Sequence, residues 1–286
     1  MPKCNRTDKN RRFIRKNSFN NHFINFASII TLKPVTTKES QKPAYPLLEN
    51  APIVEALLDI QVQLPEGKDL NALHKVFDVV KDKYPTEKKR FAFSGKIEFK
   101  AQETQAKSSI SETQVDGYLF YSEDKTKVFQ ARLSGFTFNK HKPYKSWNAL
   151  KKEAKELWTL YKKIAEPLTI NRIALRYINK IPLKIPFTPT SYFTTLPYLA
   201  KGLDYDMNNL FSQISIMNNQ LNARATITEA VELTNSDTAL FLFDIDVFQQ
   251  GDFAESEIWK NFESLRDFKN EIFFKSITAK TLKLIE

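Results

Sequence analysis

The sequence predicts an α+β protein of two similar β-α-β-β-β-α halves, whose strands form one continuous antiparallel sheet with helices packed on one face. Three observations lead to this prediction. Two strand-like segments, 53–65 and 170–182, align without a gap, and nearly every apolar position is matched. Alternating apolar residues elsewhere predict further strands. Two long amphipathic segments, 147–166 and 255–285, predict a helix that closes each half.

The two aligned strands carry opposite charges. Glu55 falls on Arg172, and Asp59 falls on Arg176. An antiparallel pairing centred on Leu57 would set Glu55 across from Arg176 and Asp59 across from Arg172. We interpret this as a cross-strand ladder that fixes the register, worth about 0.2–1 kcal/mol per exposed pair. Buried carboxylates would need close arginine partners. Reversing the charge of Glu55 should then destabilise the fold.

The same four charged residues allow a functional interpretation. Residues two and four apart on a strand share one face of the sheet. Arg172 and Arg176 would then line a charged groove on the open face and bind an anionic ligand. The ligand-binding and the structural interpretation both stay open at this point.

The first half, residues 45–168, begins with a strand over 54–64 that is rich in branched apolar residues. Asp69 is expected to cap a helix that ends before Pro85, and Ser146 the closing helix. The polar segment 102–113 is expected to be a loop. Further strands are predicted over 91–99, 117–122, 128–133 and 136–139.

The second half, residues 169–286, repeats this order with changes. A strand over 170–181 leads into a proline-rich connection and a short helical segment near 191–199. The closing helix is expected to break near residues 276–278. Further strands are predicted over 210–217, 223–232 and 239–248. We expect the two halves to form one structural unit.

Residues 1–44 are predicted to be a basic, disordered extension. They carry ten Lys or Arg against two acidic residues, a net +8 of the +10 of the whole chain. The rest is therefore nearly neutral, which argues against nucleic acid as its partner. An organelle presequence, or an arm that touches nucleic acid or anionic lipid, stays open for this segment. A secretory signal is disfavoured because the apolar run 23–32 is interrupted.

Cysteine content and hydropathy favour a cytoplasmic protein. Cys4 is the one cysteine in 286 residues, so no intramolecular disulfide is possible, as is typical of a reducing compartment. No apolar run approaches the roughly 18–20 residues that span a bilayer.

Candidate catalytic chemistry is sparse. Asp244 and Asp246 share one strand face at a spacing that Mg²⁺ could use, although two leucines lie on the same face. The three histidines are dispersed, and no phosphate-binding glycine loop, nucleophile elbow or paired-cysteine motif occurs. No cofactor is therefore expected. Aromatic residues near Tyr144 and Trp147 are expected to fill the core rather than stack on bases.

The segments Asn50–Ala56 and Arg172–Ile181 resemble a sporadically distributed bacterial family of uncharacterised proteins. Its members have an N-terminal "PIVEA" strand and a central "RIxLRYIN" strand, and the resemblance covers about residues 48–286. The family supplies no catalytic residues. Its patchy distribution implies a mobile-element or defence setting.

We therefore expect a non-enzymatic binding or interaction module of the bacterial cytoplasm. It would use the open sheet face or the groove between the halves, and its ligand would be a protein or an anionic small molecule. Two other classes stay open. A metal-dependent hydrolase or nuclease would use Asp244 and Asp246, and a nucleic-acid binder would use the basic residues of 1–44.

Overall fold

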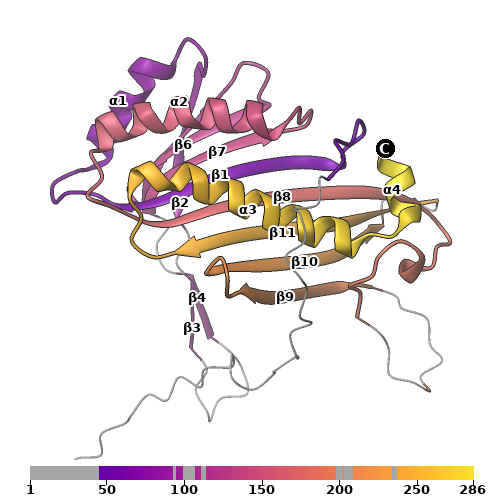
Figure 1. Cartoon of the computed structure of the whole chain (residues 1–286). Coiled ribbons are helices and arrows are strands. Elements are labelled where there is room, and N and C mark those ends of the chain that lie inside the picture. Colours follow the sequence, from indigo (N-terminus) through magenta and orange to yellow (C-terminus); the bar gives the residue numbers. More distant parts are fainter. Residues whose placement is uncertain are drawn as a thin grey trace, which may run out of the picture. The chain divides into compact units, whose positions relative to one another are not determined.

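Nine antiparallel strands form one open sheet in a computed structural model of the chain, in the order β2-β5-β6-β7-β1-β8-β11-β10-β9 (Figure 1). The structure describes residues 45–92, 95–98, 107–110, 114–197, 202, 209–233 and 237–286. Tyr45–Glu286 forms one compact unit. The predicted α+β class and antiparallel sheet are confirmed. The predicted extension, residues 1–44, lies outside the described residues.

The strands come from both parts of the chain and meet at the pair β1 and β8. From the N-terminal part come β1 (Ile53–Gln63), β2 (Thr86–Ala92), β5 (Gln114–Tyr121), β6 (Lys127–Arg132) and β7 (Gly135–His141). From the C-terminal part come β8 (Thr169–Lys184), β9 (Phe211–Asn218), β10 (Ala223–Leu233) and β11 (Thr238–Gln250). A separate two-stranded sheet pairs β3 (Gly95–Glu98) with β4 (Lys107–Ile110).

Three helices cover one face of the large sheet: α1 (Leu70–Val80), α2 (Trp147–Ala165) and α3 (Glu255–Ser276) (Figure 1). As predicted, Asp69 and Ser146 cap the first two, each accepting a hydrogen bond from the third residue beyond it. The closing helix does break where expected. It ends at Ser276, and α4 (Ala279–Ile285) follows after a cap at Thr278.

The core lies between the sheet and these helices. Alternate residues of each central strand point into it, so Leu58 of β1 and Leu175 of β8 are fully buried. Aromatic rings fill much of the space: Phe136 packs edge-on against Trp158, and Phe243 stacks on Phe273. The opposite face of the sheet carries the charged residues of β1, β8 and β11.

The register between β1 and β8 differs from the predicted one by two residues. Leu58 faces Leu175, so Arg176 lies across from Leu57, and Arg172 across from Gln61. A shift of two leaves every side chain on the same face, so apolar alternation alone could not distinguish the two registers. Glu55 and Arg176 are consequently not directly opposite each other.

Three local predictions were wrong. The segment 91–99 is not one strand, because β2 pairs with β5 and β3 with β4. Part of the expected loop 102–113 is the strand β4; the rest lies outside the described residues. Near 191–199 the structure has a single 3₁₀ turn, Pro189–Ser191, and residues 198 and 199 are not described. Within the described residues, the C-terminal part therefore has no counterpart of α1.

Candidate functional site

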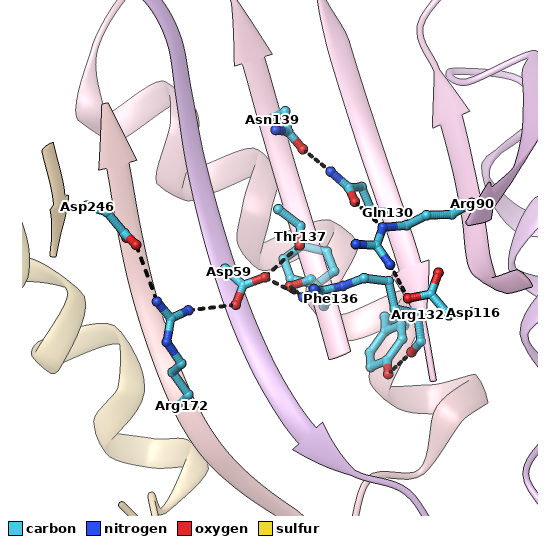
Figure 2. Close-up of polar contacts among 11 residues, drawn as sticks. Asp59, Arg90, Asp116, Gln130, Arg132, Phe136, Thr137, Asn139, Arg172 and Asp246 are labelled. Carbon is cyan, nitrogen blue, oxygen red and sulfur yellow. Dashed lines mark hydrogen bonds and ion pairs between the residues drawn. The ribbon is translucent and has the colours of Figure 1, made fainter. Parts of the chain in front are cut away.

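Asp59 of β1 and Arg172 of β8 belong to a polar network on the sheet face opposite the helices (Figure 2). Arg172 lies between two carboxylates. Its Nη1 donates to Asp59 Oδ1 at 3.2 Å, and its Nη2 lies 3.5 Å from Asp246 Oδ2. The guanidinium also stacks on the Phe248 ring, 4.5 Å from its centroid. The predicted pair of Asp59 and Arg172 thus forms, although along a diagonal of the ladder.

Asp59 is the centre of this network. It is buried, and it accepts hydrogen bonds from Thr137 Oγ1 at 2.7 Å and from Arg132, in addition to Arg172. Side chains of three strands, β6, β7 and β8, therefore donate hydrogen bonds to one carboxylate of β1. Such a carboxylate is held by charge-assisted hydrogen bonds, which are roughly twice as strong as neutral ones.

Arg176 and Glu55 do not pair with each other, and each has a different partner. Arg176 makes a bidentate contact with Asp244, with Nε to Oδ1 at 2.9 Å and Nη2 to Oδ2 at 2.5 Å. Glu55 accepts from Asn139 Nδ2 at 2.6 Å, and its Oε1 lies 3.5 Å from His141 Nε2. The prediction of an ion pair between Glu55 and Arg176 is therefore wrong.

This network leaves little charge for a ligand. Three arginines (Arg132, Arg172, Arg176) face three aspartates (Asp59, Asp244, Asp246). Burial raises the pKa of Asp246, and the nearby Arg172 and Arg176 oppose that rise. A divalent ion at Asp244 and Asp246 would have to displace guanidinium groups. In the part of the chain that the structure describes, no group of three or more His, Cys, Asp or Glu could hold a metal ion.

A second site lies on the helix side of the sheet. A cavity of about 360 Å³ opens between the segment 45–53, the start of α2 and the C-terminal half of α3. Its wall is largely apolar and aromatic, with Tyr45, Leu48, Trp147, Phe273 and Phe274 among its members. Tyr177 and Asn179 of β8 also line it. The cavity thus lies where the N-terminal and C-terminal parts of the unit meet.

Lys269 of α3 is the most unusual group of this cavity. Lys269 is 9% exposed, and its Nζ lies over the Tyr177 ring, 4.0 Å from the ring centroid. No carboxylate of the described residues lies within ion-pair distance of it. Burial, with a smaller contribution from the positive charge of Arg266, lowers the pKa of Lys269 to about 7. An unpaired buried amine is costly to a fold, so its presence needs a reason.

Two tyrosine hydroxyls line the same cavity. Tyr144 and Tyr177 share a hydrogen bond of 3.2 Å between their hydroxyl oxygens, and their rings meet edge to face. Burial raises the pKa of Tyr144 to about 12 and raises that of Tyr177 well above its usual range. Both hydroxyls therefore stay protonated at neutral pH and can donate hydrogen bonds.

The remaining charges of the cavity wall are positive. Lys145, Arg266 and Lys269 line it, and none of its described lining residues is Asp or Glu. Behind the wall, Glu263 accepts from Trp147 Nε1 at 2.9 Å and from Arg266 Nη1 at 3.3 Å. Glu263 thereby ties α3 to the first turn of α2 and orients Arg266 from one side.

Sequence reasoning missed this site, yet one signal of it is present. The buried stripe of α3 recurs every three or four residues, and Lys269 occupies a position on it. Its members are Ile258, Phe262, Leu265, Lys269, Ile272 and Ser276. A lysine on an apolar stripe is buried by the helix geometry itself, which marks it as a candidate functional residue.

The chain matches no protein-family model and no curated protein. The resemblance to the bacterial family of the "PIVEA" and "RIxLRYIN" strands stays a prediction. Among the described residues, no helix has both the length and the apolar character to cross a membrane.

Proposed function

We propose that this protein is a binding module for a small anionic molecule with an apolar body, held in the cavity between the start of α2 and α3. The single observation that carries this proposal is Lys269, a buried amine that lines a cavity of about 360 Å³ and has no carboxylate partner among the residues that the structure describes. A buried charge is normally paired. A bound carboxylate or phosphate would supply the missing partner.

The shape and chemistry of the cavity support this choice of ligand class. Its volume lies within the range of roughly 300–1,000 Å³ that is usual for small-molecule sites. Aromatic side chains make up much of the wall, and its polar groups are cationic or are amides and hydroxyls, without a carboxylate among the described residues. An aromatic carboxylate or phosphate monoester matches both features. The network around Asp59 offers no comparable unpaired charge, so the helix side is favoured over the open face.

We also propose that the unit arose by internal duplication, with the cavity beside its pseudo-twofold axis. Strand order supports this: outward from the centre, β1, β7, β6 and β5 mirror β8, β11, β10 and β9. The register supports it as well. Leu58 and Leu175 are equivalent in the ungapped alignment of the two strands, and they face each other across the ladder. Equivalent residues that face each other are expected at a twofold axis.

Calorimetric titration of the full chain with benzoate and with phenyl phosphate tests the proposal. We expect binding at pH 7 that Lys269→Met weakens about 10- to 100-fold, since a hydrogen bond to a charged group contributes about 1.5–3 kcal/mol. Lys275→Met is the matched control, because this lysine lies on the same helix with an exposed side chain. Equal affinity of the Lys269 variant and the wild type, or no binding of either probe, would refute the proposal.

A further inference from the structure

We infer that the Lys269 amine reacts reversibly with the carbonyl carbon of its ligand, so that the ligand class is an anionic aldehyde or 2-oxo acid held as an imine. This inference rests on the proposed function and makes it more specific. It depends on three features of the cavity: an amine that is free to react, cations that hold the anionic end, and hydroxyls that transfer protons.

The amine meets the requirements for a nucleophile. A lysine becomes nucleophilic when burial in an apolar pocket, or a neighbouring cation, keeps part of it uncharged. Both conditions hold for Lys269, which is nine-tenths buried and lies one helical turn from Arg266. No carboxylate of the described residues stabilises the charged form of this amine, so nothing of that kind opposes the loss of its proton. Its place over the Tyr177 ring keeps the nitrogen at the cavity wall.

Arg266 and Lys145 are suited to hold the anionic end of such a ligand. Arg266 precedes Lys269 by three residues, so the two side chains lie on one face of α3. Its guanidinium is partly engaged by Glu263 at 3.3 Å and by Asp267 at 3.4 Å, which fixes its orientation. An arginine retains further donors after two such contacts. The anionic group of the ligand would then pair with these cations while its carbonyl carbon meets the amine.

The hydroxyl pair of Tyr144 and Tyr177 completes the chemistry. The Lys269 lone pair attacks the carbonyl carbon, and the carbonyl π electrons move onto oxygen, which takes up a proton from a cavity hydroxyl. The nitrogen returns a proton, and the product is a carbinolamine. Loss of water then leaves the imine. The sum is amine plus carbonyl giving imine plus water, so neither an oxidant nor a reductant is required.

Reductive trapping on the full chain tests this inference. The protein is treated at pH 7 with a low dose of 4-carboxybenzaldehyde, or of pyruvate, together with cyanoborohydride, and is then mapped by peptide mass spectrometry. We expect one adduct per chain, at Lys269, formed on the order of 100-fold faster than at an exposed lysine. Its lower pKa leaves roughly 1,000-fold more free amine at pH 7, and the lower nucleophilicity of a less basic amine offsets part of this gain. Lys269→Met should abolish this adduct, whereas Lys275→Met should leave it unchanged. Excess benzoate should suppress it.

The outcomes separate this inference from the proposed function. Labelling spread over exposed lysines, or an unlabelled Lys269 in a protein that still binds benzoate, overturns imine formation and leaves anion binding in place. If the wild-type protein does not bind benzoate, both imine formation and anion binding are overturned. If Lys269→Met fails to fold, peptide mapping of the wild-type protein still decides the question, because it locates the adduct without any variant.

Discussion

The burial of Lys269 destabilises the folded state of the protein. Its pKa in the folded protein is about 7, below the ordinary lysine value of 10.5. Between these two pH values the unfolded chain binds more protons than the folded one, so the free energy of unfolding rises with pH. At pH 7 the cost is up to roughly 4 kcal/mol, at about 1.4 kcal/mol for each pH unit by which the pKa is lowered. Functional groups commonly carry such a cost.

The first prediction follows from this cost. Lys269→Met should raise the free energy of unfolding at pH 7 by up to roughly 4 kcal/mol, and it should remove the increase of stability between pH 7 and pH 10. Urea unfolding of wild type and variant at both pH values measures this. A variant that is less stable than the wild type at pH 7 would show that the amine has a stabilising partner.

The second prediction concerns the network on the other face. Asp59→Ala should cost about 3–5 kcal/mol, because it leaves the buried Arg132 and the half-buried Arg172 without their shared carboxylate. Glu55→Ala should cost less, about 0.5–1.5 kcal/mol, since it loses one hydrogen bond from Asn139 and a longer contact with His141. Thermal unfolding of the two variants gives this order. The reverse order would place the centre of the network at Glu55.

The sequence predicts that the charged residues of β1 and β8 share one face of the sheet, but it predicts only some of their partners. The pairing of Asp59 with Arg172 could be predicted, because the aligned strands place both residues on one face. The partner of Arg176 could not, because Asp244 comes from β11, and the position of that strand follows from the topology of the whole sheet. Lys269 belongs to no recognised motif, and its one signal in the sequence is a cation on the apolar stripe of α3.

Among the elements, the pair of β7 and β1 leaves no room for a side chain at Gly135. A Cβ atom there would lie 2.1 Å from the Ile60 carbonyl oxygen, and the backbone φ is +146°. The third prediction is that Gly135→Ala costs about 3 kcal/mol or more. Gly67→Ala is the control: its φ is +85°, but no atom lies within 4 Å of the added carbon. About 1 kcal/mol is expected there.

The difference between the two alanine variants isolates the close approach from backbone strain. Chemical denaturation measures both. Equal losses would mean that β7 moves away from β1 at little cost, which the network around Asp59 and Thr137 argues against.

The elements themselves were predictable where a local signal exists. Asp69 and Ser146 gave the starts of α1 and α2, and alternation gave β5 to β11 within a few residues. The segment 91–99 failed because its strands pair with different partners, β5 and β4, which alternation does not encode. The prediction for 191–199 failed because the chain forms a 3₁₀ turn that begins earlier, at Pro189, and because Pro197 disfavours a helix in the segment itself.

For the whole unit, the cavity is a product of long-range folding. Its wall combines residues near 45–53, 144–148, 177–179 and 266–274, which lie far apart in the chain. No spacing rule connects such segments, so the lining of this cavity could not be predicted from the sequence. The seam of β1 and β8 brings these segments together, because the two closing helices, α2 and α3, lie on the same side of the sheet (Figure 1).

Proton uptake on anion binding tests directly whether the Lys269 amine is the partner of the bound anion. At pH 8 a Lys269 amine with a pKa of about 7 is mostly uncharged, and a bound anion would favour its charged form. Titration of benzoate into the full chain in HEPES and in Tris, whose ionisation heats differ, measures the protons exchanged. We predict an uptake of about 0.9 proton per benzoate in the wild type and none in Lys269→Met. A binding heat that is the same in both buffers, or the same uptake in the variant, would contradict the account.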